Sequence, residues 1–104
     1  MVQKQAPYYN NSKFKGKMYM TKGKYKARKI LANNIVYYRL ENGWSQEDFA
    51  AELGTTPTYV SNLENARRNT RIDYIDLIAD TLGVSLNELF EEKPPVKNKR
   101  IPRR

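Results

Sequence analysis

The sequence predicts an all-α domain of five short helices. Three expected helix starts pair a hydroxyl residue, which can cap the amino end, with an acid three positions later, the pattern of a capping box. These pairs are Ser45–Asp48, Thr70–Asp73 and Ser85–Glu88. Gly43, Gly54 and Gly83 stand where helices should end, because glycine readily adopts the left-handed conformation found there. Between these signals, apolar residues recur at spacings of three and four, as on the buried face of a helix.

The first helix is expected over residues 29–42 and should stop at Gly43. Its inward-facing residues recur at i, i+4 and i+7, and they are Leu31, Ile35 and Tyr38. Trp44 follows the turn. We expect its indole to fill the core beneath this helix rather than to contact a ligand.

The second and third helices form the most informative part of the chain. Ser45 should cap the second helix and Gly54 should end it, while Thr56 should cap the third. Pro57 would occupy the first position of the third helix, where a missing N–H costs nothing. The inward-facing residues of the pair are Phe49, Ala50, Leu53, Val60 and Leu63. Their spacing, Ala-x3-Gly-x5-Val-x2-Leu, is that of the DNA-binding helix-turn-helix.

The fourth helix should open with the Thr70–Asp73 capping box and end at Gly83. Its expected inner face consists of Ile72, Ile75, Ile78, Ala79 and Leu82. The fifth helix should start at Ser85 and bury Leu86, Leu89 and Phe90. Two consecutive prolines at 94–95 would then prevent its continuation.

The third helix leaves a polar face away from the core. With Val60 and Leu63 turned inward, a step of 100° per residue places Thr58, Ser61, Asn62 and Asn65 opposite, with Tyr59 on the flank. Asn can bond adenine bidentately, Thr can contact a thymine methyl, and Ser can bond several base edges. The residues expected to contact bases directly are Thr58, Tyr59, Ser61 and Asn62. The alternative is an ordinary solvated helix face.

Residues 31–90 resemble the phage-repressor and Cro-type helix-turn-helix family, also called the xenobiotic-response-element family. The matching positions are Leu31, Ile35, Tyr38-Arg39, Gly43-Trp44-Ser45-Gln46, Ala50, Leu53-Gly54, Val60-Ser61, Leu63-Glu64, Arg67-Arg68-Asn69, Leu82-Gly83-Val84-Ser85 and Glu88-Leu89-Phe90. The resemblance implies a five-helix, lambda-repressor-like bundle that binds double-stranded DNA and regulates transcription. Part of this pattern, around residues 58–69, is also similar to restriction–modification controller proteins.

The resemblance also implies roles for single residues. Positions matching Gln46 and Asn65 commonly bind phosphates, and those matching Pro57, Thr58 and Asn62 contact bases. Together with the helix start and the nearby arginines, the expected phosphate-binding set is Ser45, Gln46, Asn65, Arg67, Arg68 and Arg71. Arg39 and Glu64 match a partly buried ion pair of the family, which we assign to the scaffold.

Three positions depart from the family pattern. Ala66 replaces the usual glycine, so either it is strained in a left-handed conformation, at about 1 kcal/mol, or the helix ends differently. Thr70 stands where proline is frequent. Pro57 replaces a longer polar side chain, which removes one potential base contact.

The net charge of +8 is unevenly distributed. Residues 1–29 contain nine lysines and arginines and no acid, residues 93–104 contain six, and residues 30–92 contain four arginines against eleven acids. We therefore divide the chain into a flexible basic tail over 1–29, a helix-turn-helix domain over 30–92 and a flexible basic tail over 93–104. An acidic domain opposes DNA binding, but three of its arginines follow the third helix and the tails can supply phosphate attraction.

The first tail has little apolar periodicity, so we expect it to be mostly disordered. Its tyrosines alternate with lysines, a composition suited to nucleic-acid contact but equally to a soluble leader. These tyrosines are Tyr8, Tyr9, Tyr19 and Tyr25. A third interpretation is a short hairpin over residues 17–25 with Lys22-Gly23 as its turn.

Composition argues against several classes of protein. The chain has no cysteine and no histidine, which removes disulfides, thiolate metal sites and the usual general base. We expect no enzyme activity, no metal and no cofactor. No apolar run approaches the roughly 20 residues of a membrane span, and no secretory signal is apparent. We expect an intracellular, cytoplasmic protein associated with the nucleoid.

Self-association and a protein partner are both open at this stage. Tyr74, Leu77 and Leu86 either complete the core or form a homodimer contact, which would favour a near-palindromic operator and a repressor. The main alternative is an antitoxin or another protein-interaction module that uses the same bundle. A further alternative is sequence-independent nucleic-acid coating by the tails.

Overall fold

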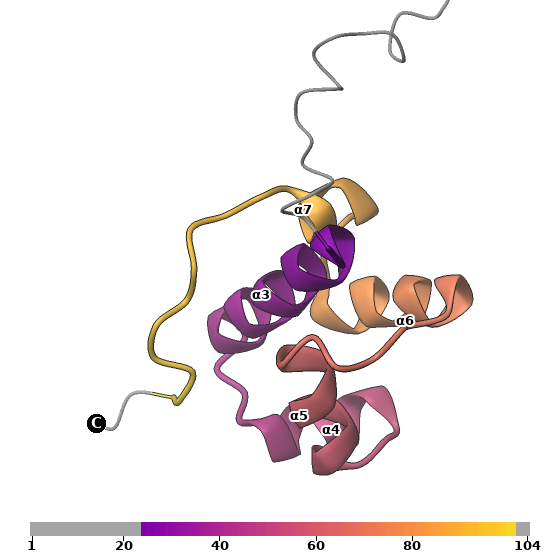
Figure 1. The fold of residues 1–104 in the computed structure, drawn as a ribbon. Helices are drawn as coiled ribbons and strands as arrows, with labels where there is room; N and C mark the ends of the chain where they lie inside the picture. The colour runs from indigo at the N-terminus through magenta and orange to yellow at the C-terminus, as the bar shows by residue number, and fades with distance from the viewer. Residues whose placement is uncertain (1–23, 102–104) are drawn as a thin grey trace, which may run out of the picture.

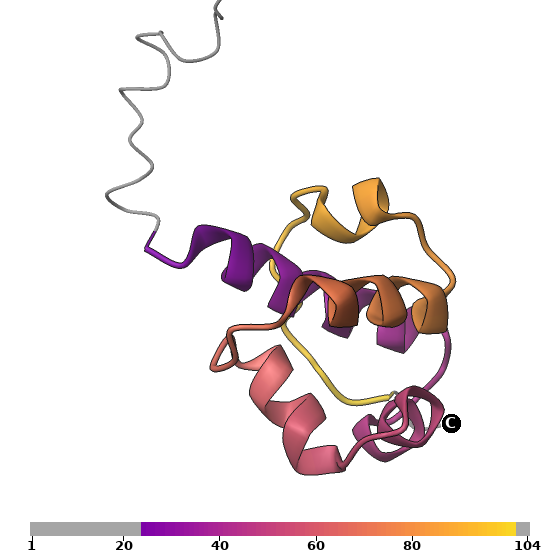
Figure 2. The same cartoon turned by 90° about the vertical axis from the view of Figure 1, so that its right-hand side faces the viewer.

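The computed structural model describes residues 24–101 and contains five helices in this part of the chain (Figures 1 and 2). They are α3 Lys26–Glu41, α4 Gln46–Leu53, α5 Pro57–Glu64, α6 Ile72–Leu82 and α7 Leu86–Phe90. The predicted all-α, five-helix architecture is confirmed. Residues 1–23 lie outside the described residues, and with them most of the tail expected to be disordered and all but the last two residues of the alternative hairpin.

One buried cluster joins all five helices. α3 contacts α5, α6 and α7, and α4 contacts α5 and α6. The cluster consists of Leu31, Ile35, Phe49, Ala50, Leu53, Val60, Leu63, Ile78, Ala79, Leu82 and Leu89. Trp44 packs against this cluster as predicted, with its indole stacked on Phe49 at 6.0 Å between ring centroids. The core therefore fixes the angle between α4 and α5.

Local sequence signals set most helix ends. Ser45 and Asp48 form a complete capping box at α4, and Ser85 forms one at α7 with Glu88. The Thr56 hydroxyl accepts a hydrogen bond from the Tyr59 N–H at 3.1 Å, so it caps α5. The three glycines that follow α3, α4 and α6 all have positive φ angles. These features match the expected starts and stops.

Two helix starts differ from the prediction. α3 begins at Lys26, three residues before the expected start, so part of the supposed basic tail belongs to a helix. α6 has Arg71 as its N-cap residue and no side-chain cap, so the predicted Thr70–Asp73 capping box is wrong. Thr70 instead lines a hollow between the helices. Ile72, expected inside, is 78% exposed. A periodic pattern identifies a face, but it does not reveal where the neighbouring elements end.

The carboxyl-terminal part also differs from the prediction. Residues 91–101, here called the C-terminal segment, were expected to be flexible from residue 93 onward. They run from α7 along α3 and end beside α4 (Figures 1 and 2). The Asn33 side chain accepts a hydrogen bond from the Val96 N–H at 2.8 Å and donates one to the Pro94 carbonyl at 3.1 Å. Leu86, expected to be buried, is 49% exposed.

Candidate nucleic-acid interface

α4 and α5 meet at a tight turn around Gly54. The N–H groups of Gly54 and Thr55 both donate to the Ala50 carbonyl, at 2.9 Å each. Ala50 is 1% exposed, and its small side chain lets the two helices lie close together. The turn presents the amino end of α5 at one side of the bundle (Figure 2). This is the helix-turn-helix arrangement expected from the spacing.

The outward face of α5 contains the predicted base-contacting residues. Pro57 and Thr58 are exposed, and Ser61 and Asn62 are partly exposed. Within residues 24–101 the Asn62 amide group makes no hydrogen bond, while its backbone carbonyl accepts the Arg67 N–H at 2.9 Å. The structure therefore places four of the five candidates on one accessible surface.

Tyr59 is placed differently from the other four candidates. Its ring packs against the core and meets Tyr74 edge-on, with ring centroids 5.5 Å apart. The guanidinium of Arg68 lies over the Tyr59 ring, 4.4 Å from its centroid, a distance typical of a cation–π contact. Burial, followed by proximity to Tyr59, raises the pKa of the Tyr74 hydroxyl. This packing favours Tyr59 as a support for Arg68 over a direct base contact.

The six candidate phosphate-binding residues lie at two sides of α5. The Ser45 hydroxyl accepts the Asp48 N–H at 3.0 Å, and the Gln46 amide donates to Glu64 Oε1 at 2.9 Å. The Asn65 amide donates to the Ser61 carbonyl at 2.8 Å. These three side chains therefore already have partners within the chain. The other three are exposed arginines in the α5–α6 connection, namely Arg67, Arg68 and Arg71.

The ion pair of Arg39 with Glu64 is present and buried, with side-chain exposures of 1% and 0%. Arg39 Nε lies 2.5 Å from Glu64 Oε2, and Nη2 lies 3.0 Å from Oε1. Two of its other N–H donors bind the carbonyls of Trp44 and Lys99, each at 2.8 Å. Because Glu64 ends α5 and Gln46 begins α4, this network links both helices to α3.

The exit from α5 contains a non-glycine residue in the left-handed conformation. Ala66 has a φ of 57°, the left-handed conformation that favours glycine. The helix itself ends at Glu64, with Asn65 as its C-cap residue. Of the two possibilities left open by the sequence, strain at Ala66 is therefore the one observed.

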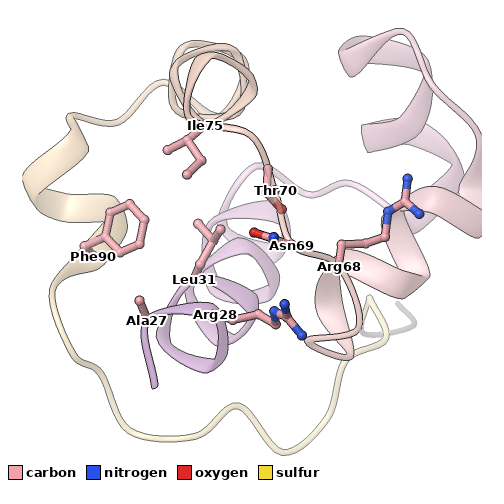
Figure 3. Close-up of a pocket in the computed structure, with 8 residues that line it drawn as sticks. All are labelled: Ala27, Arg28, Leu31, Arg68, Asn69, Thr70, Ile75 and Phe90. Atoms are coloured by element: carbon pink, nitrogen blue, oxygen red, sulfur yellow. The ribbon is translucent and has the colours of Figure 1, made fainter. Parts of the chain in front are cut away.

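A hollow of about 140 Å³ lies between α3, α6 and α7 (Figure 3). Its inner wall is apolar, while Arg28 and Arg68 approach from the side of the α5–α6 connection. Sequence reasoning placed Arg28 in a flexible tail and missed that it adds a cation beside Arg68. The signal available in the sequence was the three-residue spacing from Tyr25 to Arg28, which lets the guanidinium lie over the tyrosine ring, 4.2 Å from its centroid.

A second hollow, of about 350 Å³, lies at the amino end of α4. It is lined by Arg39, Ser45, Gln46, Glu47, Lys99, Arg100 and Ile101. Sequence reasoning did not place Lys99 or Arg100 near α4, because contacts across about sixty residues have no local signal. Over residues 24–101 no cluster of three potential metal ligands occurs, and none of the helices there could cross a membrane.

The fold and this surface define a helix-turn-helix protein of the Cro/C1 type. Residues 35–89 match the helix-turn-helix family HTH_3, and the chain belongs to this family of DNA-binding transcriptional regulators. The predicted resemblance is confirmed.

Named relatives agree with this membership. The chain is 40% identical to a hypothetical transcription factor of Neisseria meningitidis over 63 residues, covering 61% of this chain and 59% of that protein. It is 42% identical to control protein C.MunI of a Mycoplasma species over 48 residues, covering 46% and 65% respectively. The chain thus spans less than two thirds of both relatives. The solved restriction-modification controller protein C.AhdI of Aeromonas hydrophila is 29% identical, with a TM-score of 0.59 over 64% of this chain and 96% of that one.

Proposed function

We propose that this protein is a sequence-specific transcriptional regulator that binds duplex DNA as a homodimer on a near-palindromic operator. The simplest output is repression by occlusion of a promoter. The observation that carries the proposal is the accessible polar face of α5, held by a buried ion pair at its carboxyl end. No cofactor is required by this account.

Base contacts are assigned to the accessible part of α5. Asn62 offers both a donor and an acceptor, the pair that adenine presents in the major groove. Thr58 offers a methyl group and a hydroxyl, and Ser61 offers a hydroxyl. Pro57, at the exposed tip, can make only an apolar contact. Tyr59 acts mainly by holding the guanidinium of Arg68.

Phosphate contacts are assigned to both sides of α5. Arg67, Arg68 and Arg71 are exposed on the connection to α6, where one backbone of the duplex would pass. On the α4 side, Ser45 and Gln46 would contact the other backbone, Gln46 through the amide proton that is not bound to Glu64. Phosphate contacts fix register and orientation, whereas base contacts supply specificity.

Homodimerisation is proposed through the exposed apolar side chains of α6 and α7. Ile72, Leu77 and Leu86 are 78%, 43% and 49% exposed. Covering this surface with a second copy would remove apolar area from water. A two-fold dimer would present two α5 helices about one DNA turn apart, which explains the expected palindrome.

The test is selection from a random duplex pool with purified full-length protein at near-physiological salt. A near-palindromic motif with half-sites about 10 base pairs apart is expected. Failure to enrich any motif would contradict sequence-specific binding. Equal affinity for single-stranded and duplex DNA would favour coating by the basic tails instead.

The same exposed apolar residues also support a second candidate function, a protein-interaction module such as an antitoxin. In that case a different protein would cover Ile72, Leu77 and Leu86. A monomeric purified chain that forms a stoichiometric complex with a second polypeptide, and enriches no operator, would favour this alternative.

A further inference from the structure

The C-terminal segment is held along the whole length of α3. At its start, the Asn34 amide donates to the carbonyls of Leu89 and Glu91, at 2.6 and 2.8 Å. Farther along, the Asn33 side chain donates a hydrogen bond to the Pro94 carbonyl and accepts one from the Val96 N–H. These contacts use backbone groups of the segment, so they fix its path independently of its charged side chains.

Two cations also fix the segment, Lys93 of the segment near its start and Arg39 of α3 near its end. The Lys93 ammonium lies 5.3 and 5.2 Å from the ring centroids of Tyr37 and Tyr38. A hydrogen bond with the Tyr38 side chain raises the pKa of Lys93. The buried Arg39 then donates to the Lys99 carbonyl at 2.8 Å. Lys99 is therefore attached to the same guanidinium that holds the end of α5.

This path brings two cations to a side of the bundle that otherwise lacks them. Lys99 and Arg100 are exposed and line the hollow beside Ser45 and Gln46. Among residues 30–92 the only other basic residue at this hollow is Arg39, which is buried and paired. Glu47 also lines the hollow and repels phosphate. Without the segment, the α4 side would present acid to a DNA backbone.

We propose that Lys99 and Arg100 form a phosphate-binding site for the DNA backbone that passes α4, and that docking of the C-terminal segment on α3 positions it. This inference rests on the proposed function and extends it to a second cationic side, opposite Arg67, Arg68 and Arg71. The site recognises duplex DNA through its phosphates and adds affinity without sequence preference.

The salt dependence of DNA binding tests the site. Each lost phosphate contact reduces the slope of log affinity against log salt by about 0.9. Lys99→Gln with Arg100→Gln should therefore reduce it by about 1.8 for each bound protomer. Between 50 and 200 mM salt, the affinity advantage of the wild type over this variant should shrink about tenfold for each bound protomer. Lys97→Gln is the matched control, because Lys97 is an exposed cation of the same segment that does not line the hollow.

A second variant separates docking from charge. Asn33→Ala removes the hydrogen bonds to Pro94 and Val96 but keeps every cation, and it should reduce the slope by about one for each bound protomer. A wild-type slope in this variant would overturn the docking requirement. An unchanged slope in the Lys99/Arg100 variant, or an equal change per charge in Lys97→Gln, would overturn the site.

Full-length proteins should be compared on both the selected operator and a scrambled duplex. The slope changes should be similar on the two duplexes, since phosphate contacts carry no sequence information. A wild-type protein without preference for the operator would refute the proposed function, while the slope comparison on duplex DNA would still decide the present inference.

Discussion

Removal of Glu64 is the perturbation whose effect the structure specifies most fully. Glu64→Ala would leave the Arg39 guanidinium buried, with only the carbonyls of Trp44 and Lys99 as partners. It would also remove the carboxylate that accepts a hydrogen bond from the Gln46 amide at the start of α4. Breaking a buried pair in this way costs about 3–5 kcal/mol, because an uncompensated charge remains inside.

That cost is large for a domain of this size. Small domains are stable by only about 5–15 kcal/mol, and each kcal/mol shifts Tm by about 4–8 °C in a domain of 60–100 residues. Glu64→Ala should therefore lower Tm by at least about 12 °C, measured by circular dichroism at neutral pH. Glu52→Ala, on the exposed side of α4, is the matched control and should change the free energy of unfolding by no more than about 0.5 kcal/mol.

A double variant distinguishes charge from packing. Arg39→Met with Glu64→Leu removes both charges and retains similar volume, so it should be more stable than Glu64→Ala. A decrease in Tm of less than about 5 °C for Glu64→Ala would refute the reasoning. A double variant as unstable as the single one would also do so, because it would assign the loss to packing.

Three further predictions concern other parts of the chain. Ala66→Gly should raise stability by about 0.5–1 kcal/mol in urea denaturation, since it relieves a left-handed residue; no gain would mean that the exit from α5 is unstrained. Leu77→Lys should convert the proposed dimer to a monomer in sedimentation, and an unchanged sedimentation coefficient would exclude that surface. Hydrogen bonds from the Ser85 backbone and side chain lower the pKa of Glu88, so its contribution is complete above the ordinary carboxyl pKa and is lost as pH falls through the lowered value. The acid-side decline in Tm should therefore be shallower in Glu88→Gln than in the wild type, and identical declines would contradict this assignment.

Local chemistry explains what the sequence could predict. The capping boxes at Ser45 and Ser85, the proline at the start of α5 and the glycine ends depend on residues within four positions of one another. The inward face of the helix-turn-helix depends on helical period alone. These features are sufficient to predict the two helices at the proposed interface and the accessible position of Asn62.

Long-range contacts explain what it could not predict. The docking of the C-terminal segment depends on bonds between residues 60 to 63 positions apart, and prolines with lysines in a polar context indicate only a tail. The pairing of Arg39 with Glu64 followed from the family resemblance and not from spacing. The Thr70–Asp73 pattern had the right residues for a capping box, but α6 starts one position later. Likewise, the side-on packing of Tyr59 against Tyr74 depends on where α6 crosses.

The specificity ratio of one asparagine variant tests the central claim most directly. Affinity should be measured for the selected operator and for a scrambled duplex, at one fixed salt concentration, with wild type, Asn62→Ala and Asn87→Ala. Asn87 is exposed on α7, away from α5, and serves as the control. Asn62→Ala should reduce operator preference by about 1–3 kcal/mol per half-site, while Asn87→Ala should leave it unchanged. An operator preference that survives Asn62→Ala intact would contradict base recognition by this face of α5.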